Sequence, residues 1–227
     1  MPEYCNPPPA TLVFMLDVDN TLVDNDRFAA DLRARLVADF GDAESARYWA
    51  LYAQLRDELG YADYLSALQR FRAGLEDHPA LLGMSAFLLD YPFQTALFPQ
   101  ALQVLAHLQQ HATTVILSDG DVVFQPHKIR RSGIEQAVLG RILIYIHKEK
   151  MLEAVKRRYP ARHYVMVDDK AGILANMKRL LGDQLTTVFV RQGHYAQGPQ
   201  QVDPLPDRTI DTIAELLHFN FQSTGSP

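Results

Sequence analysis

Five short apolar runs, each followed by polar or charged residues, constrain the fold of this chain more than any other feature. Runs of this length are typical of strands that are buried on both faces of a parallel sheet. They cover Thr11–Leu16, Thr113–Leu117, Arg141–Ile146, Tyr164–Val167 and Thr186–Val190. Helical patterns separate the later runs, and strands that alternate with helices form βαβ units. The sequence therefore predicts an α/β fold with a parallel sheet that is wound on both faces.

The long stretch between the first two runs contains no convincing strand. Its apolar residues repeat at helical spacing, as in the four-residue repeat that begins at Phe28. We therefore expect three parts: a flexible leader (1–10), an α/β core (11–24 and 90–227) and an all-helical insertion (25–89). The aromatic residues of the insertion are interpreted as the core of a helix bundle, with a cofactor site as the alternative. No strand is expected after Val190.

The charge balance argues against a nucleic-acid partner. The chain has 22 Lys and Arg against 27 Asp and Glu, for a net charge of −5, whereas nucleic-acid-binding domains usually carry a basic stripe. Two short basic runs, Lys128–Arg131 and Lys156–Arg158, are interrupted by apolar residues. We interpret both runs as solvated faces of helices.

Targeting and cross-linking features are missing from the sequence. No apolar stretch approaches the ~20 residues that a membrane helix needs, and Met1–Ala10 lacks the basic and apolar parts of a signal peptide. Cys5 is the only cysteine, so an intrachain disulfide is excluded. We expect a cytoplasmic protein, monomeric or homodimeric, that has no membrane or nucleic-acid partner.

The first apolar run ends in two acids, Asp17 and Asp19, that stand two positions apart. Ligands of open α/β sheets bind outside the carboxyl ends of the strands, so both acids are placed for chemistry. Carboxylates this close repel one another, which favours a cation between them. A calcium-binding EF-hand loop would need glycine and glutamate where this chain has Leu22 and Phe28. A role in a turn or a helix cap remains the alternative.

Polar residues also follow the next three runs. Ser118 and Asp119 follow the second run, where a serine hydroxyl either donates to a phosphate oxygen or caps the next helix. Lys148 follows the third run, where it either reaches back to an anion or lies exposed. Asp168–Asp169 follow the fourth run, as metal ligands or as helix caps. All these groups lie at the carboxyl edge of one predicted sheet.

The order of these groups resembles that of the four motifs of the haloacid dehalogenase superfamily. In this sequence the order is Asp-x-Asp-x-Thr, then serine, then lysine, then a pair of aspartates. The superfamily places its motifs on a Rossmann-like sheet, and the helical insertion resembles the α-helical cap of its first cap class, type C1. Two positions depart from the superfamily pattern: Asn20 stands where glycine is frequent, and Ile173 where many members have a further carboxylate.

This resemblance implies catalytic and metal-binding roles for the four aspartates. Asp17 would be the nucleophile that attacks phosphorus and forms an aspartyl-phosphate. Asp19 would protonate the leaving oxygen and then take a proton from the hydrolytic water. Asp17, the backbone carbonyl of Asp19, and Asp169 would bind Mg²⁺, with Asp168 assisting.

The resemblance also implies a phosphate-binding set and a reaction. Ser118, Asp119 and Lys148 would bind the phosphoryl group, and Lys150 is the second choice for the lysine. The function expected is that of a Mg²⁺-dependent phosphatase acting on a small phosphate monoester.

Three other functions are alternatives to the phosphatase. A phosphomutase or phosphotransferase shares every core residue, and a non-catalytic binding protein shares the fold. A carbon–halogen hydrolase is disfavoured, because members that cleave such bonds lack an acid at the position of Asp19. The candidate substrate-facing positions are Asp24, Asn25 and Arg27, Gly60–Asp63, Gln125–Lys128 and Arg191–His194. For His127 and His194 an ordinary surface or hydrogen-bonded histidine is the alternative.

Overall fold

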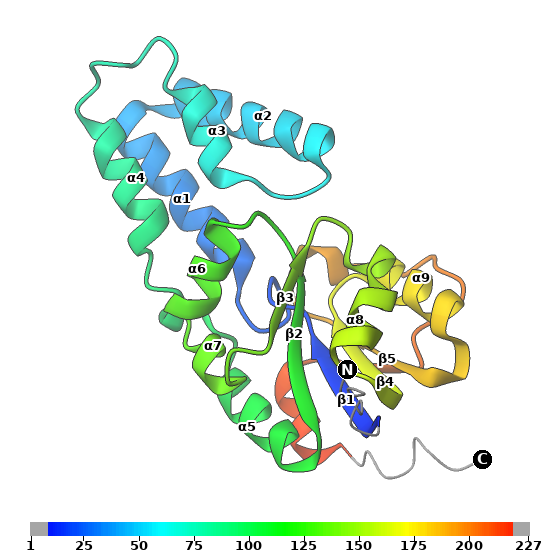
Figure 1. The fold of residues 1–227 in the computed structure, drawn as a ribbon. Coiled ribbons are helices and arrows are strands. Elements are labelled where there is room, and N and C mark those ends of the chain that lie inside the picture. Colours follow the sequence, from blue (N-terminus) through cyan, green and yellow to red (C-terminus); the bar gives the residue numbers. More distant parts are fainter. Residues whose placement is uncertain (1–8, 220–227) are drawn as a thin grey trace, which may run out of the picture.

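The computed structural model describes residues 9–219, so most of the predicted leader, including Cys5, lies outside the described residues. Within this range six strands form one sheet in the order β3-β2-β1-β4-β5-β6 (Figure 1). The strands are β1 (Ala10–Leu16), β2 (Thr113–Asp119), β3 (Ile142–Tyr145), β4 (Ala161–Asp168), β5 (Leu185–Val190) and β6 (Arg208–Ile210). All neighbouring strands are parallel. This Rossmann-like α/β sheet confirms the predicted fold class.

Helices cover both faces of the sheet and also extend beyond its carboxyl edge (Figure 1). The α-helices are α1 (Asn25–Phe40), α2 (Asp42–Leu59), α3 (Tyr64–Phe71), α4 (Ala80–Asp90), α5 (Ala101–His111), α6 (Phe124–Arg131), α7 (Ile134–Ala137), α8 (Leu152–Arg158) and α9 (Ala171–Leu181). Short 3-10 helices are η1 (Phe93–Ala96), η2 (Lys148–Lys150), η3 (Gly182–Gln184), η4 (His194–Ala196) and η5 (Ile213–His218). Helices α5 and α7 lie on one face of the sheet, and α8 and α9 lie on the other.

Successive residues of β1 point to opposite faces of the sheet and are buried on both. Phe14 and Leu16 belong to the apolar cluster on the side of α5. Val13 and Met15 belong to the cluster on the side of α8 and α9. Side chains on both faces of such a strand are buried, so polar and apolar residues do not alternate along it. This is why continuous apolar runs marked the strands in the sequence.

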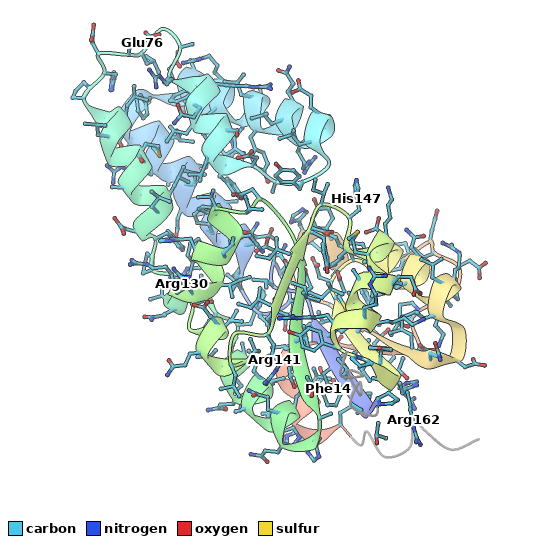
Figure 2. The ribbon with its side chains drawn as sticks, viewed as in Figure 1. Phe14, Glu76, Arg130, Arg141, His147 and Arg162 are labelled. Atoms are coloured by element: carbon cyan, nitrogen blue, oxygen red, sulfur yellow. The ribbon has the colours of Figure 1, made fainter. Side chains whose placement is uncertain are left out.

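Between β1 and β2 the chain forms helices α1–α4, and residues 25–90 contain no strand. This helical segment projects beyond the carboxyl edge of the sheet, and Glu76 lies at its far end (Figure 2). Phe28 of α1 packs against Tyr64, Tyr91 and Phe124, with ring centroids 5.1, 4.9 and 5.6 Å apart. Because Phe124 belongs to α6, this aromatic cluster joins the helical segment to the α/β part of the molecule.

Backbone hydrogen bonds tie together the two connections between the sheet and the helical segment. The Asp24 N–H donates to Ala96 O over 2.7 Å, and the Phe98 N–H donates to Leu22 O over 2.9 Å. The chain therefore leaves the α/β part of the molecule and returns to it at one place, a few residues after Asp19.

The sixth strand differs from the sequence prediction, which places no strand after Val190. β6 has only three residues, of which Arg208 and Thr209 are exposed, so it carries no apolar run. It pairs with β5 through Val190 and Ile210. A strand this short depends on its neighbour rather than on its own residue pattern.

The direction in which the chain adds strands to the sheet reverses at β1. The chain continues from β1 to β2 and β3 on one side, and it then places β4, β5 and β6 on the other side. The carboxyl ends of β1, β2 and β4 thus border the switch point at which open α/β sheets bind ligands. Among residues 9–219, none of the helices has both the length and the apolar character needed to cross a bilayer.

Candidate active site

The pairing of β1 with β4 brings the first and last predicted acids together. Leu16 is opposite Val167 in the sheet, and the Asp17 N–H donates to Val167 O over 3.0 Å. Asp17 is therefore adjacent to Asp168 and Asp169, and all three side chains are buried. Each offers one carboxylate oxygen within 4.8 Å of the others. The sheet register alone thus creates a buried cluster of three acids.

Asp169 has a buried carboxylate that accepts no hydrogen bond from the described residues. Both of its side-chain oxygens are buried, and neither has a hydrogen-bond partner among residues 9–219. Burial raises the pKa of Asp169 to about 9, with further contributions from the carboxylates of Asp168 and Asp17. A buried carboxylate without donors needs a cation or a proton to offset its charge. The cluster is therefore compatible with a divalent metal ion.

Lys148 reaches back from the turn after β3 to this acid cluster. Its Nζ lies 2.5 Å from Asp17 Oδ1 and 2.7 Å from Asp168 Oδ2, and its side chain is buried. Burial lowers the pKa of Lys148, but the charges of Asp168 and Asp17 outweigh burial and place the pKa above its ordinary value. Lys150 is exposed. Of the two candidate lysines, the structure brings Lys148 to the acids.

Ser118 and Asp119 connect the end of β2 to the same cluster. The buried Ser118 hydroxyl donates to Asp17 Oδ1 over 3.3 Å. The alternative role of a helix cap is taken by Asp121, whose Oδ1 accepts from two backbone N–H groups where α6 begins. Asp119 Oδ1 accepts from the Lys148 N–H over 2.7 Å. The carboxylate of Asp119 thus holds the turn that carries the lysine.

Asp19 contacts α6 and is not a member of the three-acid cluster. Its Oδ1 lies 2.6 Å from Lys128 Nζ, and its Oδ2 accepts from Gln125 Nε2 over 3.3 Å. Gln125 Nε2 also donates to Ser118 Oγ over 3.0 Å. The Asp19 side chain is 25% exposed and borders a cleft. Asp19 is thus held from α6 while it remains open to a ligand.

The structure contradicts part of the prediction that the run Lys128–Arg131 is a solvated helix face. The prediction is wrong for Lys128, whose side chain is 1% exposed, although Arg130 and Arg131 do face solvent. Lys128 lies three and four positions after Gln125 and Phe124, so all three share the buried face of α6. The sequence prediction followed from the charge of Lys128 and not from its position on the helix. Its spacing from the apolar Phe124 was the signal that could have indicated burial.

Asn20 shapes the turn that follows Asp19. Its φ of 57° lies in the left-handed region, which asparagine adopts more readily than most residues. Its Oδ1 accepts from the Asn25 and Asp26 N–H groups, over 3.0 and 3.3 Å, at the start of α1. Gly193 approaches so closely that a Cβ there would lie 2.4 Å from Asn20 Cγ. Asparagine therefore allows the same turn that glycine would, and its side chain also caps the helix.

A cleft of about 490 Å³ separates the carboxyl edge of the sheet from the helical segment. At the sheet edge it is lined by Asp19, Asp119 and Asp169. Its other wall includes aromatic and basic side chains of α2, namely Trp49, Tyr52 and Arg56. The interpretation of the aromatic residues as a bundle core holds for buried Tyr48 and Phe71. Trp49 and Tyr52 serve both purposes, because they pack on each other and border the cleft.

The other candidate substrate-facing residues divide into two groups. The cleft is bordered by Asn25, Gly60–Ala62 and His194. Structural partners occupy the rest: Asp24 caps α1, Arg27 donates to Thr95 O, Asp63 caps α3, His127 contacts Leu89 O, and Arg191 lies near Asp211 at the surface. Of these candidates, the ones that border the cleft thus come from α1, from the loop after α2 and from η4.

Comparison with known families identifies the chain as a hydrolase. The model of haloacid dehalogenase-like hydrolases matches residues 11–179. This chain belongs to that family. The matched range runs from β1 into α9 and includes the three-acid cluster, Asp19, Ser118 and Lys148. No protein of curated function matches the chain.

Solved structures of haloacid dehalogenase-like hydrolases share the fold. One from Burkholderia xenovorans LB400 is 54% identical, with a TM-score of 0.87 over 96% of this chain and 100% of that chain. The Bacillus subtilis HAD-hydrolase YfnB, bound to magnesium, is 19% identical, with a TM-score of 0.62 over 92% and 98%. L-2-haloacid dehalogenase from Xanthobacter autotrophicus is 16% identical, with a TM-score of 0.61 over 91% and 96%. The last two show likeness of fold alone.

Proposed function

We propose that this haloacid dehalogenase-like hydrolase is a Mg²⁺-dependent phosphatase that acts on a small phosphate monoester. The observation that carries the proposal is the placement of Asp17 in a buried acid cluster that calls for a cation, with Asp19 two residues away at the cleft. Attack of a carboxylate on an anionic phosphate needs nearby positive charge, and a departing alkoxide needs a proton. Displacement of a halide from carbon needs no such proton.

The donor atoms of the cluster fit Mg²⁺, which binds oxygen ligands and keeps several waters. Asp17, Asp169 and the backbone carbonyl of Asp19 are the proposed ligands. Asp168 is the weaker candidate, because its Oδ2 faces Lys148 and its Oδ1 accepts a backbone N–H over 2.8 Å. The bound ion would offset charge on the phosphoryl oxygens.

In the first half of the reaction, a carboxylate oxygen of Asp17 attacks phosphorus. The bond from phosphorus to the ester oxygen breaks as the bond to Asp17 forms, and protonated Asp19 gives its proton to the departing oxygen. Ser118 Oγ and Lys148 Nζ both contact Asp17, so they are placed to bind phosphoryl oxygens during attack. The products are a free alcohol and an aspartyl-phosphate.

In the second half, water attacks the phosphorus of the aspartyl-phosphate. Asp19, now a carboxylate, takes a proton from that water, and the bond between phosphorus and the Asp17 oxygen breaks. Inorganic phosphate leaves, Asp17 is again a carboxylate, and Asp19 is again protonated. The exposure of Asp19 to the cleft supports this dual role, because both the leaving group and the water must reach it.

The test compares phosphate release with chloride release by the purified protein. We expect Mg²⁺-dependent phosphate release from at least one of a panel of sugar phosphates, nucleotides, phosphoglycolate and pyridoxal phosphate, with ¹⁸O from labelled water in the product. L-2-chloropropionate serves as the dehalogenase substrate. Chloride release without phosphate release would make the protein a dehalogenase. Phosphate transfer between hydroxyls of one sugar, seen only with a bisphosphate activator, would make it a mutase.

A further inference from the structure

Lys128 is a buried cation beside the acid–base residue of the site. Its Nζ lies 2.6 Å from Asp19 Oδ1 and donates to Asn25 Oδ1 over 3.0 Å. The same nitrogen lies 5.8 and 5.4 Å from the ring centroids of Phe93 and Phe124. A desolvated ammonium is costly unless it is paired, and within residues 9–219 its ion-pair partner is Asp19. The position of Lys128 is therefore tied to the position of that carboxylate.

Both oxygens of Asp19 are held from α6, which fixes the orientation of its carboxylate. Lys128 contacts Oδ1, and Gln125 donates to Oδ2 over 3.3 Å. Gln125 is itself constrained, because it donates to Ser118 Oγ and packs closely on Gly120, where a Cβ would lie 2.9 Å from Gln125 Cβ. An aspartate in a partly exposed turn otherwise has several staggered rotamers. Contacts to two oxygens from one helix select one of them.

Lys128 also connects Asp19 to the helical segment. Asn25, the first residue of α1, accepts from Lys128 and donates to the Tyr64 hydroxyl over 3.3 Å. Tyr64 belongs to α3 and borders the cleft. A chain of polar contacts thus runs from Asp19 through Lys128 and Asn25 to the cleft wall that faces the acids.

We propose that Lys128 is the positioning residue for Asp19, with Gln125 beside it. Lys128 does not border the cleft and is 1% exposed, so it acts on the reaction through Asp19 rather than on the substrate. It holds the carboxyl group where a leaving oxygen and, later, a water meet it. This inference rests on the proposed phosphatase function, because it assigns Asp19 the acid–base role.

The test compares Lys128→Met with Arg130→Met, which removes the same charge from the exposed side of the same helix (Figure 2). Two substrates are used with Mg²⁺: p-nitrophenyl phosphate, whose leaving group needs little protonation, and β-glycerophosphate, whose alkoxide does. Misplacement of a catalytic group by ~1 Å costs about 100-fold. We expect kcat of Lys128→Met to fall about 100-fold with β-glycerophosphate and less than about 10-fold with p-nitrophenyl phosphate, with little change in KM.

A second comparison uses the Asp19→Asn background. If Lys128 acts through Asp19, adding Lys128→Met to Asp19→Asn should lower neither rate further, because the two substitutions remove one function. Lys128→Met is expected to fold, since Asp19 is open to water and can be solvated without its partner. Gln125→Met tests the same positioning without removing a buried charge, and it should show the same selective loss with β-glycerophosphate.

The outcomes separate the positioning role from the proposed function. Wild-type protein that releases phosphate from neither of these two esters nor from any member of the panel above overturns the phosphatase and with it this role for Lys128. An active wild type with equal losses on both substrates in Lys128→Met and in Gln125→Met overturns the positioning role alone. So does a loss in Arg130→Met as large as that in Lys128→Met.

Discussion

The ammonium of Lys148 and the carboxylate of Asp17 lie 2.5 Å apart, although 131 positions separate the two residues in the sequence. Both are buried, and Lys148 is shared with Asp168 at 2.7 Å. A cation between two carboxylates offsets the repulsion that a bare pair would have. The proposed nucleophile thus has a buried cation within ion-pair distance.

Lys148→Met should therefore be both inactive and less stable than wild type. Loss of the ammonium leaves Asp17 and Asp168 without their shared partner, and breaking a buried ion pair costs roughly 3–5 kcal/mol of unfolding free energy. Lys150→Met is the matched control, because Lys150 is exposed two positions away. Denaturant unfolding and phosphate release measure the two effects. Equal stability of the two variants would contradict the buried-pair argument.

Asp17→Asn should abolish turnover while the protein stays folded. The amide keeps the shape of the side chain but cannot attack phosphorus as a carboxylate does. Loss of a catalytic nucleophile lowers kcat by at least ~10³-fold. Phosphate release is the measurement, and thermal unfolding checks the fold. A variant that keeps more than about a tenth of the wild-type rate would show that Asp17 is not the nucleophile.

Removal of divalent metal should stop the reaction, and Mg²⁺ should restore it. Ca²⁺ is expected to inhibit, because its larger and less regular coordination disturbs in-line attack. Phosphate release after dialysis against a chelator, with each ion added back, is the measurement. Full activity after exhaustive chelation would remove the metal from the mechanism.

Asp169→Ala should raise the Mg²⁺ concentration needed for half-maximal activity more than Asp168→Ala does. Both Asp169 oxygens lack partners within the described residues, whereas Asp168 is engaged by Lys148 and by a backbone N–H. Asp168→Ala should instead lower the unfolding free energy more, because Asp168 is one of the two ion-pair partners of Lys148. Activity at varied Mg²⁺ concentration ranks the two variants by metal requirement, and denaturant unfolding ranks them by stability. If both rankings were reversed, Asp168 would be the metal ligand and Asp169 the partner of Lys148.

Gly193→Ala should destabilise the protein more than Gly198→Ala does. Both glycines have positive φ, 72° and 84°, which glycine adopts more readily than alanine, so alanine is strained at either position. A Cβ at Gly193 would also meet Asn20 at 2.4–2.5 Å, whereas at Gly198 it would meet nothing within 4 Å. The difference in unfolding free energy between the variants measures the contact with Asn20. Equal unfolding free energies of the two variants would show that the turn at Asn20 accommodates a Cβ at Gly193 without loss of stability.

The position of the acids and of Lys148 could be predicted because a parallel sheet gathers the carboxyl ends of its strands at one edge. Asp17, Ser118, Lys148 and Asp168 each follow a different apolar run, so finding the strands amounts to finding the site. The order of the strands in the sheet was not available from their residues. That order, with β1 between β2 and β4, is what places Asp17 against Asp168.

The support of Asp19 by α6 could not be predicted from residue type. Gln125 and Lys128 are polar, and polar residues on helices are mostly solvated, so their burial depends on what α6 packs against. The aromatic residues of α2 posed the opposite problem. Trp49 and Tyr52 have the spacing of a core face, yet they also border the cleft, and periodicity does not distinguish the two surroundings.

The paired connections at Asp24–Ala96 and Leu22–Phe98 hold the two ends of the helical segment side by side. The two ends of the helical segment lie together, and the strand register that aligns Asp17 with Asp168 lies outside that segment. Replacement of the helical segment between these ends would change part of the cleft wall and leave that register in place. The proposed catalytic groups thus follow the strands, whereas part of the cleft wall belongs to the helical segment, and the contacts of Asn25 with Lys128 and Tyr64 link the two.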